Sequence, residues 1–167
     1  MNDTYVEVMV NRKTSPFLGI GRTVLYALAV VFFLLAFVGT SLFFIPAIAF
    51  ALVAYFVIPM FDLEFEYLYI DKEISIDKIM SKEKRKHVLT VDLNKMETMA
   101  VASSHELDQY RSRNLKTYDF TSRTDEARVY TIAYESGREG TVLVNIEPNE
   151  EMLSAIKTVF PRKVLDY

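Results

Sequence analysis

Hydrophobic residues are concentrated in one uninterrupted block near the start of the chain. The 38 residues from Val24 to Phe61 (24 to 61 inclusive) contain no charged side chain, whereas a long helix on the surface of a soluble protein shows a polar face. As one helix this block would be about 57 Å long, almost twice the roughly 30 Å of a bilayer core. The pattern therefore predicts two membrane-spanning helices, and the turn-forming residues Gly39-Thr40-Ser41 mark the break.

We expect a helical hairpin over residues 16–61, with spans at about 20–38 and 42–60. Ser15-Pro16 suits a helix start, because serine caps helices and proline is tolerated at the first helical position. A cleaved signal peptide does not fit, because the apolar run begins too late and is far too long.

Three alanines, at positions 47, 51 and 54, lie close to one side of the second expected helix. Small residues there let two membrane helices approach each other closely. The alternative, in which alanine merely fills an apolar helix, stays open.

Basic residues flank the hydrophobic block on both sides and are absent from its central turn. In chain order they are Arg12, Lys13, Arg22, Lys72 and Lys78. By the positive-inside rule, we expect a two-span protein of the cell membrane with both termini in the cytoplasm. Residues 1–15 then form a cytoplasmic N-terminal segment, either a short interfacial stretch or a frayed tail.

Residues 62–167 alternate hydrophobic and polar positions with the period of two that is typical of β-strands. Seven segments fit this pattern: 65–70, 74–77, 88–93, 96–101, 115–120, 128–135 and 141–147. The period becomes helical at 149–160, where Asn149 can cap the helix and Pro161 ends it. We therefore predict a mainly-β cytoplasmic domain, a seven-stranded small barrel or sandwich capped by a C-terminal helix.

Composition excludes several kinds of chemistry. The chain has no cysteine, so disulfides, thiol catalysis and cysteine-based metal sites are ruled out. Residues 62–167 carry 16 basic and 20 acidic side chains, a net charge of 16 − 20 = −4. This balance argues against nucleic acid as a partner, because such proteins need a basic surface.

No arrangement of residues predicts catalysis. His105 stands beside Glu106 and Asp108, which are too few converging groups for a metal or acid–base site. Ser103-Ser104 lacks the sequence context of a nucleophile. We therefore expect no enzyme, no catalytic residue, no metal and no cofactor. Five tyrosines have two interpretations, packing within the sheets or lining an aromatic ligand groove. They are Tyr67, Tyr69, Tyr118, Tyr130 and Tyr134.

The best candidate for a binding site is the basic cluster Lys82, Lys84, Arg85 and Lys86. A strand that leaves the membrane near residue 63 and a second strand of similar length would return a loop at 80–86 to the headgroups. Each Lys or Arg near an anionic leaflet contributes about 1 kcal/mol to binding. Anionic lipid headgroups are thus a candidate partner, and a solvated charged turn is the alternative.

The order of seven strands and one capping helix resembles the pleckstrin-homology-like (PH-like) fold. The chain also resembles an uncharacterised family of small two-span membrane proteins from Clostridia-type Gram-positive bacteria. The segments that carry this resemblance are 2–7 (NDTYVE), 65–70 (FEYLYI), 82–86 (KEKRK), 147–153 (EPNEEML) and 161–164 (PRKV). The resemblance implies a fold and a membrane location, but no activity.

These observations predict a non-catalytic adaptor or scaffold that presents a PH-like binding domain at the inner leaflet. An unidentified protein partner would bind an edge strand or the polar loops at 103–114 and 121–127. Two alternatives stay open. One is a lipid-sensing module that uses residues 82–86, and the other is an accessory subunit of a larger membrane complex that associates through its spans.

Overall fold

The computed structural model describes residues 5–13, 16–58, 62–137 and 139–165, and it divides the chain into two compact units. The first comprises Met1–Lys13, Glu64–Ile79 and Arg85–Tyr167. The second comprises Thr14–Leu63 and Met80–Lys84. The first unit is therefore discontinuous in sequence, and the hydrophobic block is an insertion within it.

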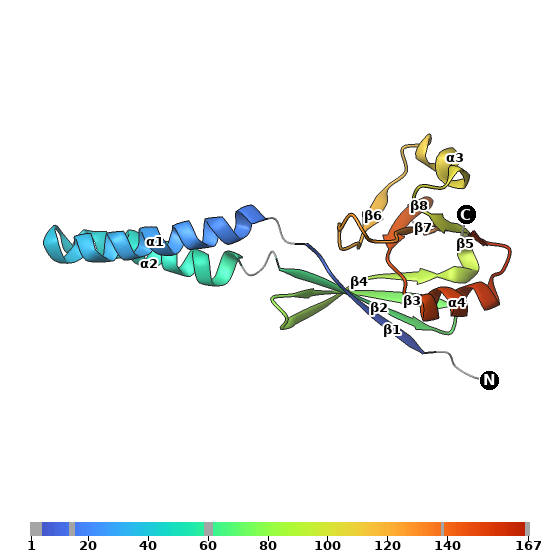
Figure 1. The fold of residues 1–167 in the computed structure, drawn as a ribbon, viewed down its shortest axis with the longest axis horizontal. Coiled ribbons are helices and arrows are strands. Elements are labelled where there is room, and N and C mark those ends of the chain that lie inside the picture. Colours follow the sequence, from blue (N-terminus) through green and yellow to red (C-terminus); the bar gives the residue numbers. More distant parts are fainter. Residues whose placement is uncertain (1–4, 14–15, 59–61, 138, 166–167) are drawn as a thin grey trace. The chain divides into compact units, whose positions relative to one another are not determined.

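The insertion point lies between the first two strands of one sheet (Figure 1). Strand β1 (Val6–Asn11) pairs with β2 (Leu63–Ile70) in antiparallel fashion, from Val6 opposite Tyr69 to Asn11 opposite Glu64. The helical segment thus takes the place of the turn that ordinarily joins two such strands. The sequence pattern predicts residues 1–15 as a segment outside the domain. The structure instead places 6–11 in the sheet.

Helix α1 (Pro16–Val38) is the one helix among the described residues that is long and apolar enough by itself to cross a bilayer. Gly39 follows the helix at a crowded position, because a Cβ atom added there would lie 3.1 Å from the Leu35 carbonyl oxygen. The next residue, Thr40, caps the following turn, and its hydroxyl accepts a hydrogen bond from the Leu42 amide at 3.4 Å. The predicted break at 39–41 is therefore where the helix ends. Ser15, its expected cap, lies outside the described residues.

The second helical segment begins with a 3-10 turn (Ser41–Phe43), continues as α2 (Phe44–Leu52) and ends in a π-helical turn (Val53–Val57). It is apolar, but at 17 residues (41 to 57) it is shorter than α1. The second span at 42–60 thus stays a prediction, of which residues 59–60 lie outside the described part.

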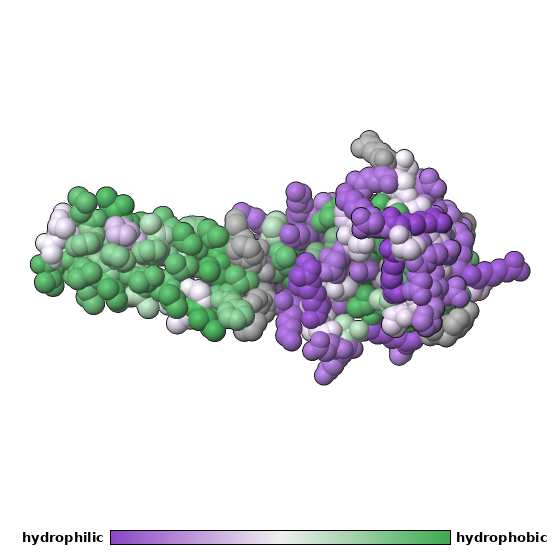
Figure 2. Space-filling view, turned by 90° about the horizontal axis from the view of Figure 1, so that it is seen from above, coloured by the Kyte–Doolittle hydropathy of each residue, from purple (hydrophilic) through white to green (hydrophobic). Residues whose placement is uncertain are grey.

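Alanines lie where the two helices touch. Ala29 and Ala36 of α1, Ala47 of α2 and Ala54 of the π-helical turn are buried. Within each helix the two alanines are seven residues apart, which places them on one side. Of the three alanines singled out from the sequence, Ala47 and Ala54 thus fit close helix packing, whereas Ala51 is only partly buried. The face of these helices that Figure 2 shows is mostly hydrophobic.

A four-stranded sheet has the order β1-β2-β3-β4, with β3 at Glu73–Met80 and β4 at Lys84–Asp92. It belongs to the first unit except for the terminal residues Leu63, Met80 and Lys84, which fall in the second. A two-residue turn joins β2 to β3, and both of its residues, Asp71 and Lys72, have positive φ angles, of 49° and 69°. Turns of this kind match the twist of a hairpin.

A five-stranded sheet follows in the order β6-β8-β7-β5-β9. The β6–β8 and β5–β9 pairs are parallel, and the other pairs are antiparallel. Its strands are β5 (Met96–Val101), β6 (Thr117–Asp119), β7 (Tyr130–Glu135), β8 (Thr141–Ile146) and β9 (Val164–Leu165). A short helix, α3 (Asp108–Arg111), lies between β5 and β6.

Both sheets contribute to one hydrophobic core, which α4 (Glu150–Val159) also enters through Met152 and Ile156. The Asn149 side chain caps α4 by accepting a hydrogen bond from the Met152 amide at 2.8 Å. The predicted C-terminal helix and its cap are confirmed, and its apolar face is core.

All seven predicted strands occur, with bounds that shift by a few residues. Two further strands, β1 and the two-residue β9, are not predicted from the sequence pattern. Within the described residues the two sheets remain separate, so the domain is a sandwich rather than a closed barrel.

The pairing of β1 with β2 predicts which part of the chain folds without the hairpin. A variant in which a short Asn-Gly linker replaces residues 14–61 should be soluble and unfold cooperatively. Residues 62–167 alone should be less stable by several kcal/mol, because Val6 and Val10 are buried and each such side chain contributes about 1.5–3 kcal/mol. Urea unfolding followed by far-UV circular dichroism measures both. Equal stability of the two proteins would contradict the assignment of β1 to the domain.

Candidate functional site

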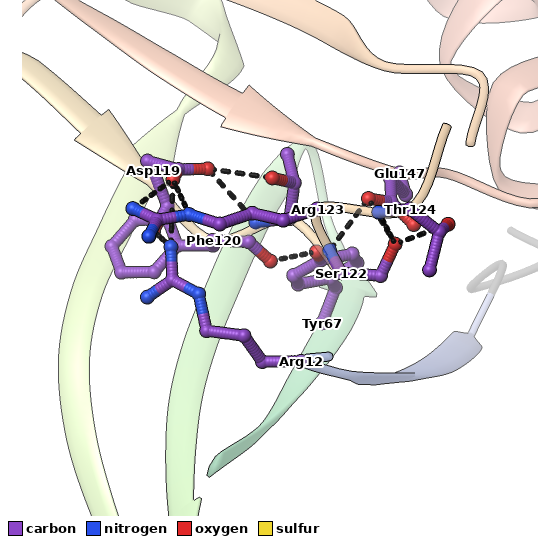
Figure 3. Close-up of polar contacts among 9 residues, drawn as sticks. Arg12, Tyr67, Asp119, Phe120, Ser122, Arg123, Thr124 and Glu147 are labelled. Carbon is purple, nitrogen blue, oxygen red and sulfur yellow. Dashed lines mark hydrogen bonds and ion pairs between the residues drawn. The ribbon is translucent and has the colours of Figure 1, made fainter. Parts of the chain in front are cut away.

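A polar cluster lies where β1 leaves its sheet toward the hairpin (Figure 3). We call it the clasp and define it by six residues that contact the end of β1 or hold its partners: Arg12, Lys13, Asp119, Ser122, Arg123 and Glu147. The Arg12 Nη2 atom donates to Asp119 Oδ2 at 2.6 Å, and the Lys13 amide donates to the Ser122 carbonyl oxygen at 2.8 Å. These contacts join the residues that follow β1 to the last residue of β6 and to the loop after it.

Asp119 is the centre of the clasp. Its carboxylate also accepts bonds from the Thr121 hydroxyl at 2.7 Å and from Arg123 Nε at 2.9 Å. Burial raises the pKa of Asp119, but the hydrogen bonds from Thr121 and Arg123 and the charge of Arg12 outweigh it, so the net pKa is lowered. The ionised carboxylate is therefore the stable form.

A second carboxylate holds the other end of the same loop. Glu147, which follows β8, accepts bonds from the Ser122 amide at 2.6 Å and from its hydroxyl at 2.9 Å. The Ser122 hydroxyl also accepts from the Thr124 amide at 3.2 Å. Because Ser122 is buried, these bonds satisfy groups that would otherwise lose water without compensation.

A buried tyrosine on β2 forms a hydrogen bond with the backbone at the start of the same loop. Tyr67 is fully buried, and its hydroxyl donates to the Phe120 carbonyl oxygen at 2.5 Å. Burial raises the pKa of Tyr67, which keeps the phenol protonated so that it can donate this bond. The Arg12 guanidinium lies over the Phe65 ring, 5.3 Å from its centroid.

The basic cluster predicted as a lipid contact is divided between a turn and a strand. Ser81–Glu83 form the turn, with positive φ at Ser81 and Lys82, and β4 begins at Lys84. The prediction of a loop over residues 80–86 is therefore wrong for 84–86, because Lys84, Arg85 and Lys86 belong to β4.

Arg85 is engaged within the domain. Its Nη2 atom lies 2.8 Å from Oε1 of Glu66, a buried carboxylate on β2. Burial and a hydrogen bond with Glu7 raise the pKa of Glu66, whereas the charge of Arg85 lowers it. Arg85 therefore offsets the cost of a buried acid, and we infer a structural role for it.

The three lysines of the cluster differ from Arg85. Within the described residues Lys82, Lys84 and Lys86 are exposed and make no ion pair. Lys84 and Lys86 are two apart in one strand and share a face. The cluster thus offers three unneutralised charges, not four.

The other polar residues singled out from the sequence have local partners. His87, on β4, places Nδ1 2.9 Å from Asp77 Oδ1 and Nε2 3.1 Å from the Thr90 hydroxyl. His105 is fully exposed and contacts Asp108 at 3.2 Å. No three His, Asp or Glu side chains of the described residues converge in a way that could hold a metal.

Of the five tyrosines, four are buried in the core and the fifth, Tyr118, is half-buried against it. Sheet packing is therefore the correct interpretation. The buried tyrosines are Tyr67, Tyr69, Tyr130 and Tyr134.

The clasp cannot be predicted from the local sequence pattern. Arg12 and Asp119 are 107 positions apart, and each looks like an ordinary charged residue in its local context. The alternation of Val6, Val8 and Val10 with Glu7 and Met9 is the signal that could have placed β1 in the sheet.

Two sheets over one core, capped by a C-terminal helix, define a mainly-β domain of the PH-like class. Residues 2–166 match the family described as Bacterial PH-like domain (DUF6106), and the chain belongs to this family. The PH-like part of the sequence-based resemblance is thereby confirmed. The two-span architecture and the Gram-positive origin stay predictions. No curated protein and no solved structure matches the chain.

The clasp predicts an acid-sensitive contribution to stability. Because the pKa of Asp119 is lowered by folding, its contribution is present above the ordinary aspartate pKa of about 3.9 and is lost as pH falls below it. Asp119→Asn should lower the free energy of unfolding by about 1–3 kcal/mol at neutral pH and flatten its fall toward pH 3. Urea unfolding from pH 3 to 7 tests this, with Asp125→Asn in the exposed neighbouring loop as the control. An unchanged pH profile in Asp119→Asn would remove Asp119 from this role.

The Arg85–Glu66 pair predicts a contrast between neighbouring cations. Arg85→Ala should cost about 1–3 kcal/mol of unfolding free energy, because it leaves a buried carboxylate without its partner, whereas Lys86→Ala should change it by less than about 0.5 kcal/mol. Adding Glu66→Gln to Arg85→Ala should recover part of the loss. Equal effects of the two alanine substitutions would show that the Arg85–Glu66 pair does not contribute to the free energy of unfolding.

Proposed function

We propose that the chain is a non-catalytic adaptor or scaffold that is anchored in the cell membrane by its helical hairpin. In this role it presents its PH-like domain at the inner leaflet to a protein partner. The family assignment supports a binding domain, and the apolar surface of α1 supports the anchor.

The observation that carries the proposal is the pairing of Asn11 with Glu64. These residues flank the hairpin and lie opposite each other in neighbouring strands, about 5 Å apart between Cα atoms. A chain that leaves the domain through α1 must therefore return to the same place. If α1 crosses the bilayer, residues 41–61 have to cross back, which supports two spans and termini on one side.

The length of the returning segment is compatible with a crossing. Residues 41–57 extend about 26 Å as a helix, close to the roughly 30 Å of a bilayer core, and 17 residues lies at the lower end of the usual range for a span, about 17–25. Charges favour the cytoplasm for both ends, because the cations that flank the hairpin lie on its open side and residues 39–41 have none.

The clasp suits an adaptor. It fastens the strand that leads into α1 to the loop at 119–124 through an ion pair and a backbone bond. This attachment holds the end of β1 against its own domain.

Topology is the test of the proposal. The chain lacks cysteine, so single substitutions give clean probes. Ser41→Cys, between the helices, should react with a membrane-impermeant maleimide on intact cells. Ser103→Cys, exposed in the domain, should react only after the cells are opened. Labelling of Ser103→Cys on intact cells would overturn the orientation, and protection of Ser41→Cys in all conditions would overturn the second span.

Lipid sensing is the second candidate function, and the three unpaired lysines of residues 82–86 favour it. The partner would be anionic headgroups, and the attraction would be electrostatic and salt-sensitive. Arg85 is left out of this set because its partner is Glu66.

A further inference from the structure

The second unit contains a hollow of about 400 Å³. It is lined by Arg22 of α1, by Tyr55 and Phe56 of the π-helical turn, and by Met80, Ser81, Glu83 and Lys84. The volume is within the range of small-ligand sites, about 300–1,000 Å³. Two cations, one carboxylate and two aromatic rings thus surround one space.

Arg22 lies within a helix that is otherwise apolar, and it has no anionic partner among the described residues. It follows the start of α1 by six residues, about 9 Å, and its guanidinium lies over the Tyr26 ring at 5.7 Å. A cation at this depth of a membrane helix is costly unless an anion neutralises it. In a bilayer the nearest external anion at that level is a lipid phosphate.

The other residues of the hollow complement such a headgroup. Lys84 supplies a second cation that makes no ion pair in the described structure. Glu83 supplies an acceptor for hydroxyl groups and leaves the hollow with a net charge of +1. Tyr55 and Phe56 are exposed aromatic residues of the kind that sits at the membrane–water interface.

We propose that this hollow binds the phosphate of an anionic glycerophospholipid, with phosphatidylglycerol as the best match. Arg22 and Lys84 would neutralise the phosphate, and Glu83 would accept hydrogen bonds from the glycerol hydroxyls. This inference rests on the proposed membrane insertion and deepens it. It names a specific site, whereas lipid sensing by the basic cluster needs only diffuse attraction, and Lys82, Arg85 and Lys86 do not line the hollow.

The test uses the full chain in phosphatidylcholine bilayers that contain trace spin-labelled lipids. Electron paramagnetic resonance then reports the lipid that the protein holds motionally restricted. Labelled phosphatidylglycerol should be selected over labelled phosphatidylcholine. Arg22→Gln should lower this selectivity about fivefold, as expected for the loss of one lipid-paired cation, while the restricted phosphatidylcholine fraction, which reports insertion, stays unchanged.

Lys82 gives a matched control, since Lys82→Gln and Lys84→Gln remove the same charge from the same turn region. Only Lys84→Gln should reduce the selectivity. Equal losses in the two variants would overturn the site in favour of diffuse attraction. Selectivity that survives Arg22→Gln would also overturn it.

Soluble phosphate esters are the other source of the same chemistry. If millimolar glycerol phosphate abolishes the phosphatidylglycerol preference, the hollow takes a soluble ligand and the lipid assignment is overturned. A preference that withstands this competitor supports the lipid. Absence of restricted lipid of either class would overturn the proposed function itself, whereas restricted lipid without a preference would overturn only this site.

Discussion

The pairing of β1 with β2 is the constraint on which the rest of the structure depends. It holds residues 11 and 64 side by side and turns everything between them into a loop that must return to its origin. Because backbone hydrogen bonds of a sheet fix both register and direction, the hairpin is part of the domain's topology rather than a leader attached to it. The proposed membrane anchor and the folded domain are therefore linked through one six-residue strand.

Polar contacts at the end of β1 add to the bonds that this strand makes within its sheet. An edge strand of six residues has one neighbour in its sheet, and in the described structure Arg12 and Lys13 add bonds to the loop at 119–124. Asp119 and Glu147 orient that loop from two sides. In the basic cluster, Arg85 has a structural role because it pairs with Glu66. Lys82, Lys84 and Lys86 are exposed and make no ion pair among the described residues.

The sequence predicts what depends on local periodicity. The helix break at Gly39, the seven strands, the cap at Asn149 and the core face of α4 all follow from spacing and turn chemistry. It does not predict what depends on distant partners. Strand β1 precedes the hydrophobic block, and its partner lies more than fifty residues later, so its valine alternation has no local context. For the same reason the sequence does not predict the Arg12–Asp119 and Arg85–Glu66 ion pairs.

The central claim is that the helical hairpin is closed at its base by paired strands, and a disulfide measures this most directly. In the full-length protein in native membranes, Asn11→Cys together with Glu64→Cys should oxidise to an intramolecular disulfide, since facing Cα atoms lie about 5 Å apart and bridges form in this range. The facing pair Thr131→Cys and Asn145→Cys in β7 and β8 provides the positive control. Formation of the 11–64 bridge is the predicted result. Its absence, with the control bridge formed, would contradict the account.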